Sequence, residues 1–129
     1  MRRRGFRGPR SSAWTIDEPD TRRERMRGAR DLRWLTSTHG VLFRRCRSVH
    51  TFGMREPIVV AALDARLCVV HVRIVRPRRL WLPRTRVRHV LEARADADVQ
   101  RGDRFFPNDE ARPERRRGEG PTTLRPTRR

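Results

Sequence analysis

Three side chains that could bind a metal recur at every fourth position near the middle of the chain: Cys46, His50 and Met54. Alternate residues of an extended chain share a face, and residues four apart also align on a helix, so these side chains would point the same way. Thiolate, imidazole and thioether are soft ligands that suit copper(I) and, in part, zinc. Cysteine and methionine are also ordinary core residues, and Gly53 favours a bend that would break the row. The row therefore indicates either a soft-metal site or two core side chains beside one polar residue.

His50 is also the residue best placed for acid–base chemistry. Ser48 and Thr51 flank it, and Asp64 or Asp103 could orient its ring. Such groups form a triad only through their geometry, however, and Ser or Thr at a strand end more often caps the backbone. The chain has neither a glycine-rich nucleotide fingerprint nor a CxxC pair. The sequence thus leaves enzymatic activity uncertain and favours a non-catalytic protein. It predicts no cofactor. A metal-dependent enzyme that uses the row Cys46, His50 and Met54 is kept as the second alternative function.

The same stretch could instead line a concave surface at the end of a sheet, where small β domains bind ligands or protein partners. In this interpretation Arg55 would hold an anion, with Arg47 in support. A structural interpretation competes with it, in which residues 50–52 tie one sheet to the other. The candidate binding residues are His50, Phe52, Met54, Arg55, Arg47 and Asp64.

The elements that must position these residues are strands. Residues 58–63, IVVAAL, are uninterrupted and rich in β-branched side chains, which predicts a strand buried on both faces. A short turn leads into a second strand over residues 67–75, and the two form a predicted β-hairpin. Beyond it Pro77, within the sequence RPRR, has no N–H to donate and interrupts the ladder. The apolar face of the second strand is predicted to lie on the core, as for a sheet covered on one side, and consists of Cys68, Val70, Val72 and Ile74.

Other elements are short. Trp14 and Ile16 are the first predicted core residues, on a short strand. Thr21 and Glu24 have the spacing of a capping box, which predicts the start of a short helix. Further apolar runs predict strands at residues 41–43, 80–82, 86–92 and 104–106.

These elements predict a mainly β fold, a small β-sandwich or jelly-roll-like domain with one short N-terminal helix. The predicted domain spans residues 13–106. Residues 1–12 are rich in Arg and Gly and are predicted to form a disordered arm, because they hold too little apolar surface to order themselves. Residues 107–129 are predicted to form a disordered tail rich in Pro and Arg.

The chain of 129 residues carries a formal net charge of +18 and contains no lysine. The charge is spread along the chain, with +5 over residues 1–14, +10 over residues 15–106 and +3 over residues 107–129. A preference for G/C-rich codons would also replace Lys by Arg. Either way, the protein is predicted to adhere to polyanions such as nucleic acid at low salt. An Arg-driven, largely non-specific nucleic-acid-binding protein is therefore an alternative function.

No apolar run approaches the ~18–20 residues of a membrane helix, and the basic start is not followed by the apolar middle of a secretory signal. The expected compartment is therefore the cytoplasm, with no membrane partner. Cys46 and Cys68 are accordingly expected to be free thiols.

Residues 48–63, SVHTFGMREPIVVAAL, resemble the central signature SVHTFGMRFPIDVVFLD of the bacterial family called domain of unknown function 192, in its high-G+C version. Residues 88–92, RHVLE, resemble the family's ARHVLE, and Gly102-Asp103 resembles its closing GD. The match runs in order over residues 15–106. The chain departs from the signature at Glu56, where the family has an aromatic residue, and at Val59, where it has Asp, and the segment between residues 92 and 102 is shortened.

The resemblance implies a small, mostly β, jelly-roll-like domain with no established reaction. Together with the residues above, it favours a cytoplasmic, non-catalytic module that binds a small ligand or a protein partner.

Overall fold

The computed structural model describes residues 1–27, 36–46, 48–51, 54–82 and 86–108. Within them strands dominate and helix is sparse, which confirms the mainly β prediction. The elements are β1 (Arg2–Arg7), the 3-10 helix η1 (Pro9–Ser11), β2 (Ala13–Glu18), α1 (Arg22–Arg27), β3 (His39–Arg44), β4 (Val49–His50), β5 (Ile58–Leu63), β6 (Val69–Val75), β7 (Leu80–Trp81), β8 (His89–Arg94) and β9 (Phe106–Pro107). No helix in these ranges combines the length and apolar composition needed to cross a membrane.

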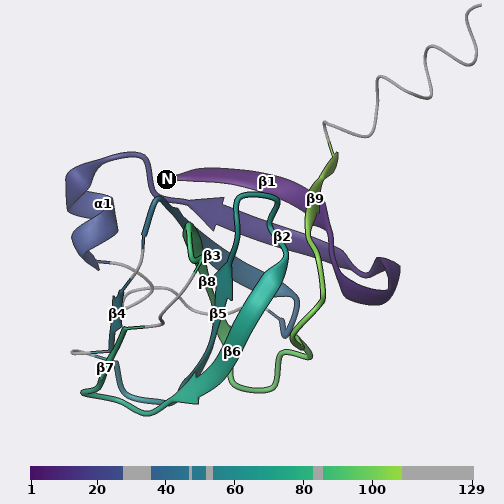
Figure 1. The fold of residues 1–129 in the computed structure, drawn as a ribbon. Helices are drawn as coiled ribbons and strands as arrows, with labels where there is room; N and C mark the ends of the chain where they lie inside the picture. The colour runs from purple at the N-terminus through teal and green to yellow at the C-terminus, as the bar shows by residue number, and fades with distance from the viewer. Residues whose placement is uncertain (28–35, 47, 52–53, 83–85, 109–129) are drawn as a thin grey trace, which may run out of the picture.

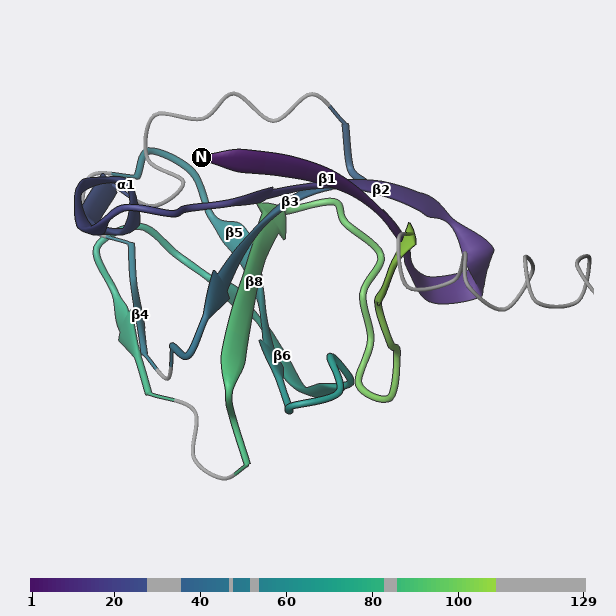
Figure 2. The same cartoon turned by 90° about the horizontal axis from the view of Figure 1, so that it is seen from above.

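One long sheet makes up most of the domain, in the order β6-β5-β8-β3-β2-β1-β9. Its pairs are antiparallel except β2 and β3, which run parallel. The sheet curls strongly around its own concave side (Figure 2). A second, two-stranded sheet of β4 and β7 lies beside it (Figure 1).

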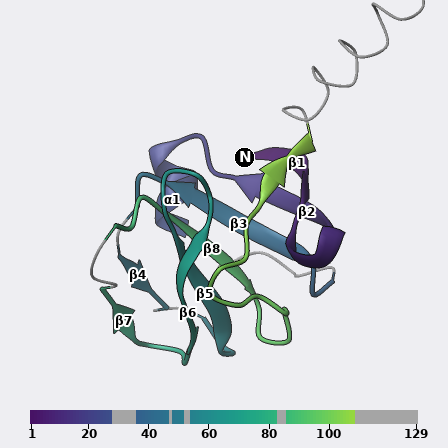
Figure 3. The same ribbon diagram turned by 45° about the vertical axis from the view of Figure 1, so that its right-hand side comes forward.

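The segment after β8 links the two edges of the curled sheet. The Val69 N–H donates to the Asp103 carbonyl at 2.8 Å, and the Phe105 N–H donates to the Leu67 carbonyl at 3.1 Å. The chain then enters β9, which pairs with β1 at the other edge, Phe6 opposite Pro107 (Figure 3). The curled sheet is therefore closed much like a barrel, which limits its exposed edges.

The concave side is filled by apolar side chains. Trp14 and Phe105 meet edge to face there, with ring centroids 5.1 Å apart. Gly8 is required beside them, because a Cβ at this position would collide with the Trp14 indole. This inner core consists of Phe6, Trp14, Ile16, Leu42, Val59, Ala61, Leu63, Leu67, Val69, Leu91, Ala93, Val99 and Phe105.

The convex side of the sheet carries a second apolar cluster beneath β4 and β7. Every residue of β5 is buried, because alternate side chains enter the inner core and this outer cluster. The prediction that residues 58–63 are buried on both faces is confirmed. The outer cluster consists of Val49, Ile58, Val60, Ala62, Val75, Val87 and Val90, with Cys46, Met54, Val70 and Trp81 packed against it.

The N-terminal arm was predicted to be disordered, and this is wrong. Residues 2–7 form β1 and pair with β2 along its whole length, from Arg2 opposite Glu18 to Arg7 opposite Ala13. Two features offset the low apolar content. Phe6 is buried in the inner core, and the acidic residues of β2 neutralise the neighbouring arginines. The domain therefore begins at β1 rather than at residue 13, and residues 109–129 of the predicted tail lie outside the described ranges.

The 58–75 hairpin is confirmed, but the prediction for the faces of β6 is wrong. Ile74 is 60% exposed and Val72 36% exposed, whereas Val69 and Val75 are buried. The register shifts between Ala62 and Leu63, so the two ends of β6 bury opposite faces. β6 is also an edge strand of the sheet, and part of its apolar face is left uncovered.

The predicted capping box is confirmed at the start of α1. The Glu24 N–H donates to Thr21 Oγ1 at 3.1 Å, and the Thr21 N–H donates to Glu24 Oε1 at 3.3 Å. Each side chain thereby satisfies a backbone N–H that the first helical turn leaves without a partner. Both cysteines are free thiols, as expected.

Candidate functional site

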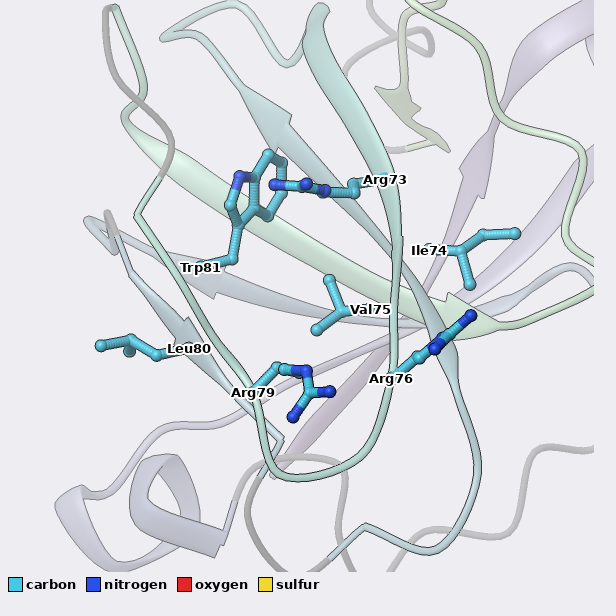
Figure 4. Close-up of a pocket in the computed structure, with 7 residues that line it drawn as sticks. All are labelled: Arg73, Ile74, Val75, Arg76, Arg79, Leu80 and Trp81. Atoms are coloured by element: carbon cyan, nitrogen blue, oxygen red, sulfur yellow. The ribbon is translucent and has the colours of Figure 1, made fainter.

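A pocket of about 270 Å³ lies where β6 turns into β7. Figure 4 shows Arg73, Val75, Arg79 and Trp81 extending into the space between the two strands. The other lining residues are at its rim. The complete lining is Arg73, Ile74, Val75, Arg76, Arg79, Leu80 and Trp81.

The pocket is strongly basic. Three of its seven lining residues are arginines, and none is acidic. Arg73 lies over the Trp81 ring, with its guanidinium carbon 6.0 Å from the ring centroid. Among the described residues, no carboxylate forms an ion pair with Arg73, Arg76 or Arg79. Because guanidinium groups bind carboxylates and phosphates through paired N–H donors, this arrangement can hold an anion.

Thr51 fixes the turn that carries these arginines. Its hydroxyl donates to the Arg76 carbonyl at 2.6 Å and accepts from the Arg79 N–H at 2.9 Å. Its own N–H donates to the Arg79 carbonyl at 2.9 Å, and its carbonyl accepts from the Arg78 N–H at 3.1 Å. Thr51 is fully buried. One side chain and its peptide groups therefore hold residues 76–79 in place.

The turn needs this support because its backbone is unusual. Arg78 has a φ of 60°, in the left-handed region. That conformation costs a residue with a Cβ roughly 1–2 kcal/mol. The hydrogen bonds from Thr51 offset this cost and fix the backbone on which Arg76 and Arg79 stand.

The predicted binding stretch borders this pocket at one strand. His50 on β4 is exposed and pairs with Leu80 on β7. Arg55 is exposed, and Met54 is partly buried against the outer face of the sheet. Phe52 and Arg47 lie outside the described residues.

Asp64, predicted to lie near this stretch, is at the end of β5 away from the pocket. It lies about 20 Å from Ile58 at ~3.3 Å per residue, whereas Ile58 pairs with the pocket residue Val75. Its Oδ1 accepts the N–H groups of Arg66 at 2.8 Å and Cys68 at 3.0 Å. Asp64 therefore stabilises the β5–β6 turn. Asp103, the other candidate for orienting His50, accepts the Gln100 N–H at 2.7 Å in a different turn.

The predicted metal row is divided between two environments. Cys46 and Met54 pack against the same apolar clusters on the convex face. His50 is exposed on β4, beside the buried Val49. The Cys46 thiol lies 3.1 Å from the Ser48 carbonyl and is placed to donate to it. Among the described residues, no group of three or more His, Cys, Asp and Glu side chains could hold a metal ion.

Glu92 is a buried acid that the sequence did not single out. It lies on β8 between Val41 on β3 and Val60 on β5, and it is 7% exposed. Neither direct cross-strand neighbour offers a polar side chain, and burial raises the pKa of Glu92 to about 8. Glu92 is therefore protonated at neutral pH. The same convex face carries Arg73 opposite Val60, so the acid lies two strands from the pocket.

The pocket arginines were not predicted from the sequence. The segment RPRR at residues 76–79 indicates a break in the ladder, and Trp81 falls in a predicted strand. A usable signal was present, since four arginines and a tryptophan fall within the nine residues 73–81, which contain no acid. These side chains come together only because of the conformation of the β6–β7 turn, which the sequence pattern does not specify.

No protein-family model and no curated protein matches the chain. Two solved structures share its fold. A protein from Sinorhizobium meliloti 1021, described as a "putative transcription regulator", is 20% identical, with 82% of this chain and 94% of that chain covered and a TM-score of 0.72. A protein of unknown function from Novosphingobium aromaticivorans DSM 12444 is 13% identical, with 78% and 82% covered and a TM-score of 0.63. At these identities the likeness establishes the fold alone: a small, mainly β domain.

Proposed function

We propose that this chain is a non-catalytic binding module that holds an anionic ligand in the basic pocket between β6 and β7. The observation that carries the proposal is the grouping of Arg73, Arg76 and Arg79 around one hollow that no acidic side chain lines. Thr51 holds two of these residues by their backbone, so the turn from which the charged side chains extend is fixed before a ligand arrives. Such preorganisation lowers the entropy lost on binding.

The composition of the pocket supports binding rather than catalysis. Its lining is arginine, aliphatic residues and one tryptophan. General acid–base and nucleophilic catalysis require groups such as His, Cys, Ser, Asp or Glu within reach of the reacting atoms. None of these lines the pocket.

A second candidate is diffuse binding of nucleic acid by arginines over the whole surface. It draws on the net charge of +18 and on the description of the Sinorhizobium meliloti protein as a "putative transcription regulator". The two candidates differ in what they require. Diffuse binding depends on the number of charges and weakens steeply with salt, whereas pocket binding depends on particular arginines.

Calorimetric titration with inorganic pyrophosphate at near-physiological salt separates the two. The test variant is R76Q/R79Q, and the control is R66Q/R101Q, which removes two exposed arginines outside the pocket lining. We expect the pocket variant to lose at least about ten-fold in affinity, the equivalent of one charge-assisted hydrogen bond, and the control to stay within about two-fold. Equal losses in both variants would contradict the proposal and favour diffuse binding.

We also propose that the chain belongs to the domain of unknown function 192 family and acts in the cytoplasm. The family proposal rests on the signature at residues 48–63, whose IVVAAL segment forms the fully buried strand β5. The cytoplasmic proposal draws on the two free thiols. A solved family member whose signature formed an element other than the equivalent of β5 would contradict the first, and secretion of the protein by its native cell would contradict the second.

A further inference from the structure

The pocket pairs its charges with a planar aromatic surface, which a simple anion does not need. Trp81 is partly buried and turns its ring toward the space between β6 and β7, with Arg73 over it (Figure 4). Indole and guanidinium are both flat groups with π-faces. Such pairs stack on nucleobases, and each stacked base contributes about 1–3 kcal/mol.

The size of the pocket indicates that it holds one unit of a longer ligand. Its volume of about 270 Å³ falls below the ~300–1,000 Å³ of pockets that enclose a whole small molecule. Two of the rim residues are apolar side chains open to solvent, since Ile74 and Leu80 are each 60% exposed. A ligand that fills the hollow can therefore continue past these side chains.

Two of the arginines, Arg76 and Arg79, lie apart from the surface formed by Arg73 and Trp81. Arg76 and Arg79 stand at the turn, and Arg73 and Trp81 lie further along the two strands. A nucleotide has the same division, with a flat base at one end and a charged phosphate at the other. Bases within a duplex are covered on both faces by their neighbours, so they could not reach Trp81 without leaving the stack.

We infer that the basic pocket binds single-stranded nucleic acid, with one unpaired base against the Arg73–Trp81 surface and the adjoining phosphates on Arg76 and Arg79. This inference rests on the proposed anion-binding function and narrows its ligand. An acidic protein segment would satisfy the arginines but would leave the aromatic surface without a matching group.

The test compares two fluorescently labelled strands about eight nucleotides long by anisotropy at near-physiological salt. One is an oligothymidylate, and the other has the same phosphates but no bases. We expect the abasic strand to bind at least about five-fold more weakly, which corresponds to the loss of one stacked base. This comparison uses the unaltered protein, so it does not depend on whether a variant folds.

Two variants test whether the difference in affinity between the two strands depends on the Trp81 ring. W81L should lower the affinity for oligothymidylate to that for the abasic strand and leave abasic binding unchanged. W81F keeps a π-face and should retain most of the difference between the strands. Equal binding of both strands by the unaltered protein, or a difference that survives in folded W81L, would overturn the inference.

Failure of the inference can be told apart from failure of the proposed function. In one outcome, oligothymidylate and the abasic strand bind equally well, and binding of both is weakened by R76Q/R79Q but not by R66Q/R101Q. The pocket then binds anions without contacting bases. If the two double variants weaken binding to the same extent, the pocket has no special role, and both proposals fall. Pocket-dependent binding of polyglutamate without pocket-dependent binding of oligothymidylate would overturn the inference in favour of an acidic protein partner.

Discussion

Arginines occur in two contrasting settings, along the first strands and around the β6–β7 pocket. On β1, Arg3 makes two hydrogen bonds to Asp17, at 2.8 and 3.1 Å. Glu18 accepts from Arg4 at 3.1 Å and from Arg44 at 2.8 Å. Around the pocket, Arg76 and Arg79 form no ion pair with a carboxylate of the described residues.

The difference shows that neighbouring acids, rather than the arginines, decide the role of each cluster. Asp17 and Glu18 are consecutive on β2, so their side chains point to opposite faces of the sheet. Each neutralises the arginines of its own face. Where β2 supplies acids, arginines stabilise the fold. At the turn after β6, no carboxylate of the described residues neutralises Arg76 or Arg79, as the proposed anion site requires.

The largest effect on stability is expected from removing the charge of Asp17, which pairs with Arg3 on the first strands. Burial would raise the pKa of Asp17, but hydrogen bonds from Arg3 and His39 outweigh it and hold the pKa below its usual value. Asp17→Asn keeps the shape but removes the charge and places a donor against donors. We expect it to lower the free energy of unfolding by about 3–4 kcal/mol, measured by urea denaturation at pH 7.

The matched control is Asp96→Asn, because Asp96 pairs with Arg94 at 2.7 Å on the surface. Both partners are well exposed, so the change should leave the urea midpoint unaltered. A midpoint for Asp17→Asn as high as that of Asp96→Asn would show that the first cluster contributes nothing to the fold.

Glu92 pairs with no arginine of the described residues, so its loss of charge should stabilise the fold where the loss of charge at Asp17 destabilises it. Its pKa of about 8 lies above its ordinary value of 4.5, which applies to the unfolded chain. The stability that protonated Glu92 contributes is therefore complete below pH 4.5 and is lost as pH rises through 8. The slope is about 1.4 kcal/mol per pH unit, or about 2–3 kcal/mol between pH 5 and pH 7.

Glu92→Gln, which cannot ionise, should abolish this slope in urea denaturation curves recorded from pH 5 to pH 8. The variant should be more stable than the natural chain at pH 7 and close to it at pH 5. A slope that is the same in both proteins would mean that Glu92 is ionised in the folded state and has found a partner.

Replacing the residue that supports the pocket turn should have an intermediate effect. Thr51→Val keeps the shape but leaves the Arg76 carbonyl and the Arg79 N–H without the hydroxyl they bond to. We expect the free energy of unfolding to fall by about 1–2 kcal/mol. Pyrophosphate affinity should also fall, because the arginines lose their fixed backbone. Unchanged affinity in a destabilised variant would separate Thr51 from the pocket.

The smallest effect on stability is expected from the pocket arginines themselves. R76Q/R79Q removes two exposed charges from a basic surface, so the free energy of unfolding should change by less than about 0.5 kcal/mol. Its consequence should be confined to ligand binding. A loss of stability comparable to that of Asp17→Asn would show that these arginines also hold the fold.

Much of the fold could be predicted because it follows from local patterns. The uninterrupted run at residues 58–63 identified a strand buried on both faces, and Thr21 with Glu24 identified the start of the helix. The β1 arm could not be predicted, because its ordering depends on a register that places Arg3 opposite Asp17, fourteen positions away. The Arg- and Gly-rich composition of residues 2–7 gives no information about β2, the strand that orders them.

Of the candidate pocket between β6 and β7, the sequence predicted only the neighbouring residues and not the lining. His50 pairs with Leu80 at the edge of the pocket, and Thr51 bonds the turn, yet the arginines that line the pocket come from that turn and from β6. Asp64 was misplaced because a hairpin separates residues that are near in sequence by the length of its strands. The structural alternative for residues 50–52, tying one sheet to the other, describes Thr51 well.

The pairing of β1 with β9 also has a consequence for synthesis. Phe6 meets Pro107, so the sheet cannot close until about 90 further residues have followed β2 out of the ribosome. At ~5–20 residues per second this takes on the order of 5–20 s, far longer than a hairpin needs to form. The nascent chain therefore exposes the inner face of its first hairpin, Phe6 and Trp14 included, throughout that interval. The order of the strands thus prolongs the time for which these apolar side chains are open to other chains during synthesis.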